Sequence, residues 1–114
     1  MVRVRVMAVA LIVAFVMGQA LPAGASVLVR AKCDVFDPVK VSVQHGTKVV
    51  WKGVCGTHTV TAYGANWSKD VTIGQGQTTS KTFKRVGLFK YRCRLHSSLT
   101  NGLCAGMCGK IRVT

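Results

Sequence analysis

Apolar and polar residues alternate along several short stretches of this chain, and each stretch ends at turn-forming residues. The clearest case is residues 39–43, V-K-V-S-V, where valine occupies every second position. A period of two predicts a β-strand with one buried face. Residues 49–51 are apolar throughout, and residues 59–61, Thr-Val-Thr, are all β-branched. Both features favour further strands. After residue 25, no stretch has the apolar period of an amphipathic helix.

Turns separate these stretches at short intervals. The main turn signals are the segments 45–46, 63–66 and 74–77, and Pro38 holds Asp37 in an extended conformation. Together they separate about eight short strands, with a turn roughly every 8 to 12 residues, which predicts an all-β sandwich or barrel. We expect a β-sandwich whose inward-facing alternate residues form the core. The expected strands are 27–29, 39–43, 49–51, 59–61, 71–73, 78–83, 89–94 and 110–113.

The N-terminus has the three parts of a secretory signal peptide. Two arginines form a positive start, residues 6–17 are apolar, and Ala-Gly-Ala at 23–25 is a small-residue cleavage site. The apolar run is shorter than the roughly 20 residues that a spanning helix needs, and no second run follows it. We therefore predict a signal peptide at 1–25 and a single mature domain at 26–114 without a transmembrane segment. That domain is expected to be exported, to the periplasm or the extracellular space.

The mature domain would be strongly basic. Only Arg3 and Arg5 of the 16 basic residues precede residue 26, which leaves 14 basic residues against three aspartates, a net charge of +11. Such a charge steers association with anionic partners without identifying them. A solvated surface is the simplest explanation, and an acidic redox protein is the partner that we retain as an alternative. Nucleic acid is not expected, because the aromatic residues are too few to form a stacking surface.

Four residues together form the donor set of a metal site. Cys93, His96 and Met107 lie close together near the C-terminus, and His58 lies far upstream in G-T-H-T-V. Two imidazoles and a thiolate with a weak axial thioether are the ligands of a blue-copper electron-transfer site. The set joins soft sulfur, which suits Cu(I), to nitrogen, which suits Cu(II). The sequence thus predicts one copper ion.

The position of Cys93 in its strand favours a buried thiol. Alternate side chains of a strand share a face, so we expect Tyr91, Cys93 and Leu95 to point to one side and Arg92 and Arg94 to the other. The alternative explanation is that Cys93 is a free structural thiol or forms a disulfide.

Five cysteines in an exported chain leave one without a partner. If Cys93 is a metal ligand, the other four can form two disulfides, which persist in oxidising compartments. Four cysteines permit three pairings. We favour Cys33 with Cys55, which would join the start of the sheet to the loop before the upstream histidine, and Cys104 with Cys108, beside the methionine.

Several of these motifs occur in one order that is known from a protein family. The segments are H-G-T-K-V-V-W at 45–51, T-H-T-V at 57–60, F-K-x-x-G-L-F-K-Y-R-C-x-x-H at 83–96, then Gly-Met and a final G-K-I-R-V. From about Phe36 to Val113, the chain resembles the small cupredoxins such as plastocyanin, pseudoazurin and amicyanin, which are type 1 blue copper proteins. The resemblance implies an eight-stranded Greek-key sandwich with copper at one end.

In that family the metal is held by two histidines and a cysteine, with an axial methionine. Carried over to this chain, the resemblance implies His58, Cys93 and His96 as ligands and Met107 as the axial ligand. The chain departs from the family pattern in two places. The segment between His96 and Met107 is longer, and Thr59 stands where the family often has asparagine.

The function expected from these observations is single-electron transfer between larger redox partners by an exported monomer. No enzyme activity is expected, because the site would have no open coordination position and no general base beside it. We retain two alternatives: copper storage, delivery or tolerance in the cell envelope, and a β-sandwich adhesion module that binds no metal.

Overall fold

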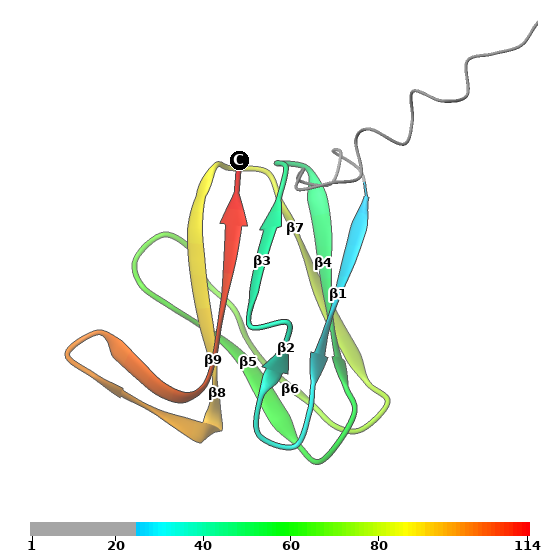
Figure 1. The fold of residues 1–114 in the computed structure, drawn as a ribbon, viewed down its shortest axis with the longest axis vertical. Coiled ribbons are helices and arrows are strands. Elements are labelled where there is room, and N and C mark those ends of the chain that lie inside the picture. The colour runs from blue at the N-terminus through cyan, green and yellow to red at the C-terminus, as the bar shows by residue number, and fades with distance from the viewer. Residues whose placement is uncertain (1–24) are drawn as a thin grey trace, which may run out of the picture.

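In residues 25–114, nine β-strands form two sheets that pack face to face (Figure 1). The computed structural model describes residues 25–114, so the predicted signal peptide lies outside the described residues apart from Ala25. One sheet has the strand order β2-β1-β4-β7 and the other β3-β9-β8-β5-β6. Residues 25–114 contain no helix, and hence none that could cross a membrane. The strands are β1 (Ser26–Ala31), β2 (Phe36–Asp37), β3 (Lys40–Val43), β4 (Thr47–Gly53), β5 (His58–Tyr63), β6 (Asp70–Ile73), β7 (Thr78–Phe83), β8 (Gly87–Thr100) and β9 (Leu103–Val113).

The predicted all-β sandwich is confirmed, with one strand more than expected. The additional strand is β2, which has two residues and pairs antiparallel with β1. It lies just before Pro38, between the first two strands expected from the sequence. Phe36 of β2 is buried, and its ring lies 4.8 Å from that of Tyr91. Phe36 therefore anchors β2 to the core, in addition to the pairing with β1.

The core consists of the inward-facing alternate residues of both sheets. Trp51 of β4 is fully buried at its centre, with its ring 5.2 Å from Tyr91 and 6.5 Å from Phe83. Trp67, from the loop after β5, covers the edge of this cluster at 6.4 Å from Trp51. Each fully buried large apolar side chain contributes roughly 2–3 kcal/mol to folding. The aromatic cluster therefore stabilises the body of the sandwich by apolar contact alone, without a metal.

The greatest difference from the sequence prediction lies at the C-terminal end. We expected strands at 89–94 and 110–113 joined by a long loop, but β8 and β9 continue as one antiparallel hairpin that projects from the body (Figure 1). Its turn is Asn101-Gly102, with positive φ at both residues. An Asn-Gly pair with this conformation is the preferred two-residue hairpin turn. This local signal was present in the sequence and identifies the arm.

Gly109 allows the closest approach between the two long strands. It pairs directly with Tyr91, and a Cβ atom at Gly109 would overlap the Tyr91 ring. We expect Gly109→Ala to lower the free energy of unfolding by roughly 1–3 kcal/mol, because overpacking forces the ring or the backbone to move. Urea unfolding of the single variants and of Gly109→Ala with Tyr91→Leu measures this. If the ring is the obstacle, the double variant loses less than the sum of the singles, whereas strict additivity would contradict the explanation.

Candidate metal centre

Three of the four predicted ligands meet at one end of the sandwich. His58 is the first residue of β5, while Cys93 and His96 lie in β8. Their ligand atoms all lie within 4.8 Å of one another. Cys93 and His58 are buried, and His96 is exposed. One donor side chain from β5 thus lies close to two from the adjacent strand, β8.

A break in the β8–β9 ladder creates the space for these donors. Arg92 pairs with Cys108, but the next pair is Ser97 with Gly106. Four residues of β8, from Cys93 to His96, therefore lie opposite a single residue of β9, which is Met107. Bulges of this kind bend a strand and redirect its side chains. The register places the fourth predicted ligand, Met107 of β9, across from the two predicted ligands of β8.

The break also corrects one expectation. Strict alternation predicted Leu95 on the inner face with Cys93, but Leu95 is 57% exposed. Alternation fails there because the strand leaves the ladder after Arg92. Met107, by contrast, is buried in the same apolar cluster as Cys93. Gly106 permits the approach of the strands, since a Cβ atom there would lie 2.5 Å from the His96 carbonyl oxygen.

Both histidines turn a ring nitrogen toward the cysteine sulfur. The Sγ atom of Cys93 lies 3.7 Å from Nδ1 of His58 and 3.3 Å from Nδ1 of His96. The other nitrogen of His58, Nε2, lies 2.6 Å from the carbonyl oxygen of Cys55. A carbonyl can only accept a hydrogen bond, so Nε2 carries the proton. This leaves Nδ1 with a free lone pair directed at the centre, as a metal ligand requires.

The sulfur of Cys93 has a further contact from the backbone. The Thr59 amide lies 3.4 Å from Sγ and donates to it. This contact helps to fix the position of the sulfur, which binds metal as the thiolate. The Thr59 hydroxyl in turn accepts a hydrogen bond of 2.8 Å from the backbone N–H of Arg94. Thr59 therefore joins β5 to both sides of Cys93.

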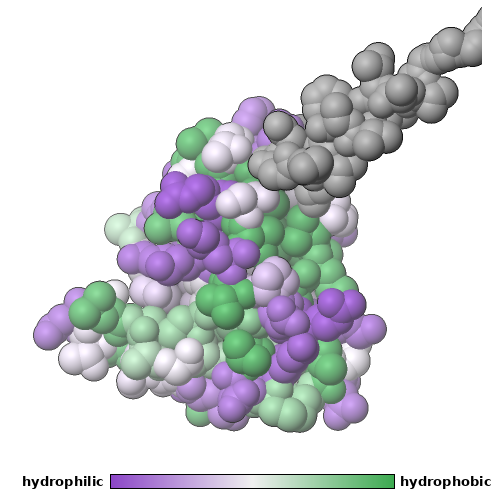
Figure 2. All heavy atoms as spheres, in the orientation of Figure 1, coloured by the Kyte–Doolittle hydropathy of each residue, from purple (hydrophilic) through white to green (hydrophobic). Residues whose placement is uncertain are grey.

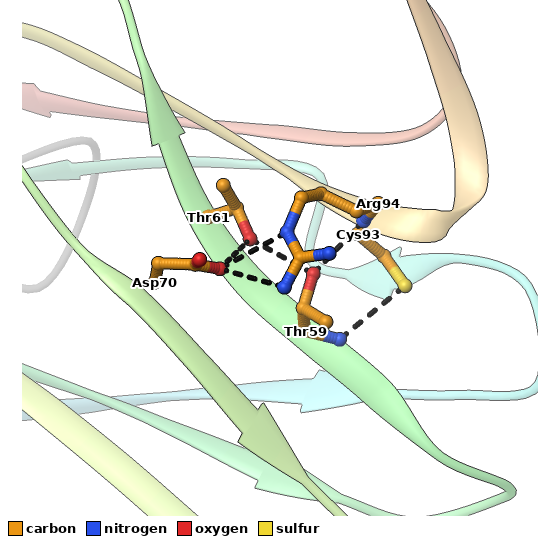
Figure 3. Close-up of polar contacts among 5 residues, drawn as sticks. All are labelled: Thr59, Thr61, Asp70, Cys93 and Arg94. Carbon is orange, nitrogen blue, oxygen red and sulfur yellow. Dashed lines mark hydrogen bonds and ion pairs between the residues drawn. The ribbon is translucent and has the colours of Figure 1, made fainter.

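A polar network on the outer face of the sheet holds Thr59 in place (Figure 3). Its hydroxyl lies 2.9 Å from that of Thr61, which lies 2.8 Å from a carboxylate oxygen of Asp70. The guanidinium of Arg94 contacts the same oxygen at 3.1 Å. Each hydroxyl has one proton and the carboxylate can only accept, so the hydroxyl protons point in sequence from Thr59 through Thr61 to Asp70. The Thr61 hydrogen bond, and then Arg94, lower the pKa of Asp70, which keeps this carboxylate charged.

Several solved structures share this fold. The chain is 24% identical to amicyanin from Paracoccus versutus, with a TM-score of 0.60, covering 82% of this chain and 85% of that one. It is 15% identical to a purple cupredoxin from Nitrosopumilus maritimus, with a TM-score of 0.60, covering 76% and 98%. It is also 21% identical to a copper-containing nitrite reductase from Thermus scotoductus SA-01, with a TM-score of 0.63, covering 86% of this chain but only 26% of the enzyme. The chain has the cupredoxin fold. No protein-family model and no curated protein sequence matches it.

In this cupredoxin fold the donor set suits a single copper ion. Two imidazole nitrogens and one sulfur converge, and the sulfur is enclosed by protein. Nitrogen with one thiolate is the ligand combination of copper electron-transfer sites, whereas structural zinc sites usually take four strong donors. No Asp or Glu belongs to the group of donors found among residues 25–114. A hard cation that requires oxygen ligands therefore does not fit.

The four remaining cysteines form the two bridges favoured from the sequence. Cys33 joins Cys55, and Cys104 joins Cys108, which leaves Cys93 as the free thiol. The first bridge anchors the loop whose carbonyl fixes the His58 tautomer. The second lies within β9, on either side of Gly106 and Met107, where the strand is sharply bent.

The sequence did not identify the outer network. Alternation along 59–61 could have placed Thr59 and Thr61 on one face, and Asp70 is one of only three acidic residues after residue 25. The contact with Arg94 depends on the pairing of β5 with both neighbouring strands, which a local pattern does not reveal.

We expect Thr59→Val to lower the free energy of unfolding by roughly 1–3 kcal/mol. Valine has the same shape, but the Arg94 amide would lose its acceptor in a buried position, which costs about that amount. Thr59→Ser is the matched control because it keeps the oxygen. Urea unfolding compares the two, and amide hydrogen exchange at Arg94 reports the lost bond directly. If the valine and serine variants are equally stable, the hydrogen bonds of the Thr59 hydroxyl do not contribute to the stability of the fold.

Proposed function

We propose that this protein is an exported type 1 copper protein that carries single electrons between larger redox partners. The observation that carries the proposal is the pair of imidazole nitrogens that face one buried cysteine sulfur. The cupredoxin fold supports it. In this proposal His58, Cys93 and His96 hold the ion and Met107 is the axial ligand. A bound copper ion would supply one-electron chemistry between Cu(I) and Cu(II).

The residues around the donors limit their movement. The Cys55 carbonyl orients His58, the Thr59 amide fixes the sulfur of Cys93, and the two long strands hold Met107 opposite the break. Donors that keep their positions in both oxidation states require little rearrangement when an electron is gained or lost. This pre-organisation is what a rigid scaffold contributes to such a site.

Access to the centre is one-sided. His58 and Cys93 are buried, whereas His96 is exposed and has the exposed Leu95 beside it. A partner protein can approach the donors closely only at this histidine. Protein covers these two ligands, which is consistent with an electron carrier that catalyses no reaction by itself.

The partner that we propose is an acidic redox protein. After residue 25 the sequence contains fourteen basic residues and only three acidic ones, all aspartates. Opposite charge raises the rate of encounter more than it raises affinity, which suits brief contacts between electron carriers. The predicted signal peptide is consistent with action outside the cytoplasm.

The absorption spectrum of the purified mature protein loaded with copper tests the proposal. An intense thiolate-to-Cu(II) band with reversible oxidation and reduction is the expected result. Tight, colourless Cu(I) binding without reversible cycling would instead favour copper storage or delivery. Absence of copper binding would overturn both and leave a β-sandwich without a metal role.

The first variant to examine is Cys93→Ser. We expect the intense thiolate band to disappear, because the sulfur is its source, while the far-ultraviolet circular dichroism stays unchanged. The fold should persist since the aromatic cluster around Trp51 forms without the metal. A thiolate band of full intensity in this variant would remove Cys93 from the ligand set.

The second variant is Met107→Leu, which nearly conserves volume and should cost less than about 1.5 kcal/mol in stability. We expect its reduction potential to rise, because the substitution removes a donor that favours Cu(II). Cyclic voltammetry measures the shift. An unchanged potential together with an unchanged spectrum would show that Met107 is a core residue and does not reach the metal.

A further inference from the structure

Five basic residues lie together on the outer face of the five-stranded sheet. The register aligns Lys40 of β3 with Lys110 of β9, and Lys110 with Lys90 of β8. Arg112 and Arg92 occupy the adjacent outward positions on either side of this row, in β9 and β8. Hydrophilic side chains gather over β3, β8 and β9 in Figure 2. We call the set Lys40, Lys90, Arg92, Lys110 and Arg112 the basic band.

This arrangement is unfavourable for the isolated protein. Like charges directly opposite each other on neighbouring strands destabilise a sheet. The three aspartates do not relieve the repulsion, because Asp37 pairs with Lys32, Asp70 pairs with Arg94, and Asp34 lies between β1 and β2 on the other sheet. Among residues 25–114, no carboxylate forms an ion pair with the basic band. Its positive charge is therefore available to an external anion.

The other sheet shows what a balanced face looks like. There Arg30 is aligned with Lys52, which is again a pair of like charges. On its other side, however, Arg30 is aligned with Asp37 of β2, whose pKa is lowered chiefly by Lys32 and also by Arg30. A carboxylate thus accompanies the basic residues of that sheet. No carboxylate of residues 25–114 is aligned directly with the basic band: Asp70 is separated from Arg92 by Thr61 in the register and pairs with Arg94.

One end of the band, at Arg92, lies next to the metal centre. Arg92 immediately precedes Cys93, and its guanidinium donates a hydrogen bond of 3.1 Å to the hydroxyl of Ser97. It therefore spans the break in β8 that contains the ligands Cys93 and His96. Beyond Arg92 the character of the surface changes. Residues 95–109 include no charged side chain, and the projecting arm is mostly apolar or neutral in Figure 2.

We propose that the basic band is the docking surface for an acidic face of the redox protein that exchanges electrons with this centre. The inference rests on the proposed function. A protein fits better than nucleic acid because, among residues 25–114, a single cation–π contact involves the band, that of Lys90 with Tyr63. It fits better than an anionic membrane because the exposed leucines of the hairpin lie outside the band, Leu95 in the break and Leu99 and Leu103 on the arm. A partner held on the band is brought against the strand that carries Cys93.

A pair of matched variants tests the position of the surface. Lys40→Gln with Lys110→Gln removes two charges from the band, and Lys48→Gln with Lys52→Gln removes two from the other sheet. Both change the net charge equally, so only the location differs. We expect the band variant to be no less stable than the parent at low salt, since like-charge repulsion is relieved. A clear loss of stability would show that these lysines serve the fold, which would overturn the inference.

Binding is measured with poly-L-glutamate added to the reduced, ¹⁵N-labelled protein, followed by nuclear magnetic resonance. We expect shifts at amides of β3, β8 and β9, about tenfold weaker binding in the band variant and less than about twofold in the control, with the difference lost at high salt as screening increases. Equal weakening in both variants, or shifts centred on the other sheet, would overturn the inference. If the band variant loses binding to phosphatidylglycerol vesicles but still binds poly-L-glutamate as the parent does, the band would be assigned to membranes instead.

The connection to electron transfer requires the copper-loaded protein. The bimolecular rate of oxidation by hexacyanoferrate(III), a small anionic acceptor, should fall several-fold in the band variant and less in the control. Equal rates in the two variants would show that the band does not guide an acceptor to the centre. The binding measurement does not depend on copper. A protein that binds poly-L-glutamate on the band but takes up no copper would therefore refute the electron-transfer function and not the anion-binding role of the basic band.

Discussion

The whole centre depends on one break in the hydrogen-bonded ladder between β8 and β9. If the ladder continued beyond Arg92, Cys93 and His96 would project from regular positions along a flat strand, and they could not share a site. Because four residues of β8 face only Met107, the strand bulges toward β5 and meets His58. The sandwich core on one side and the hairpin arm on the other hold the two ends of the bulge in place.

Around this break, backbone groups orient the donor side chains. The Cys55 carbonyl decides which nitrogen of His58 faces the centre, and the Thr59 amide contacts the sulfur of Cys93. Backbone groups are held by the sheet and the disulfide loop, so they do not depend on long flexible side chains. The outer network that ends at Asp70 restrains Thr59 from the solvent side, where Arg94 covers it.

Much of this structure could be predicted from local patterns. Alternating valines predicted β3, and the order of His58, Cys93, His96 and Met107 predicted the metal donors. The odd number of cysteines predicted one free thiol. The hairpin was missed because the alternation of apolar and polar residues stops after Leu95, although Asn101-Gly102 marked its turn. The exposure of Leu95, the tautomer of His58 and the row of lysines all depend on which residues lie opposite one another. Register is a property of strand pairing, and no single stretch of sequence reports it.

The hairpin restricts how this protein can change in length. Met107 lies opposite the bulge only because the residues of the arm, from Ser97 to Gly106, pair one to one across the turn. Adding one residue to each strand of the arm would lengthen it and leave Met107 where it is. A single insertion on one side would shift the pairing and turn alternate side chains to the opposite face. Length variation compatible with the centre should therefore occur in pairs of residues, placed symmetrically about Asn101-Gly102.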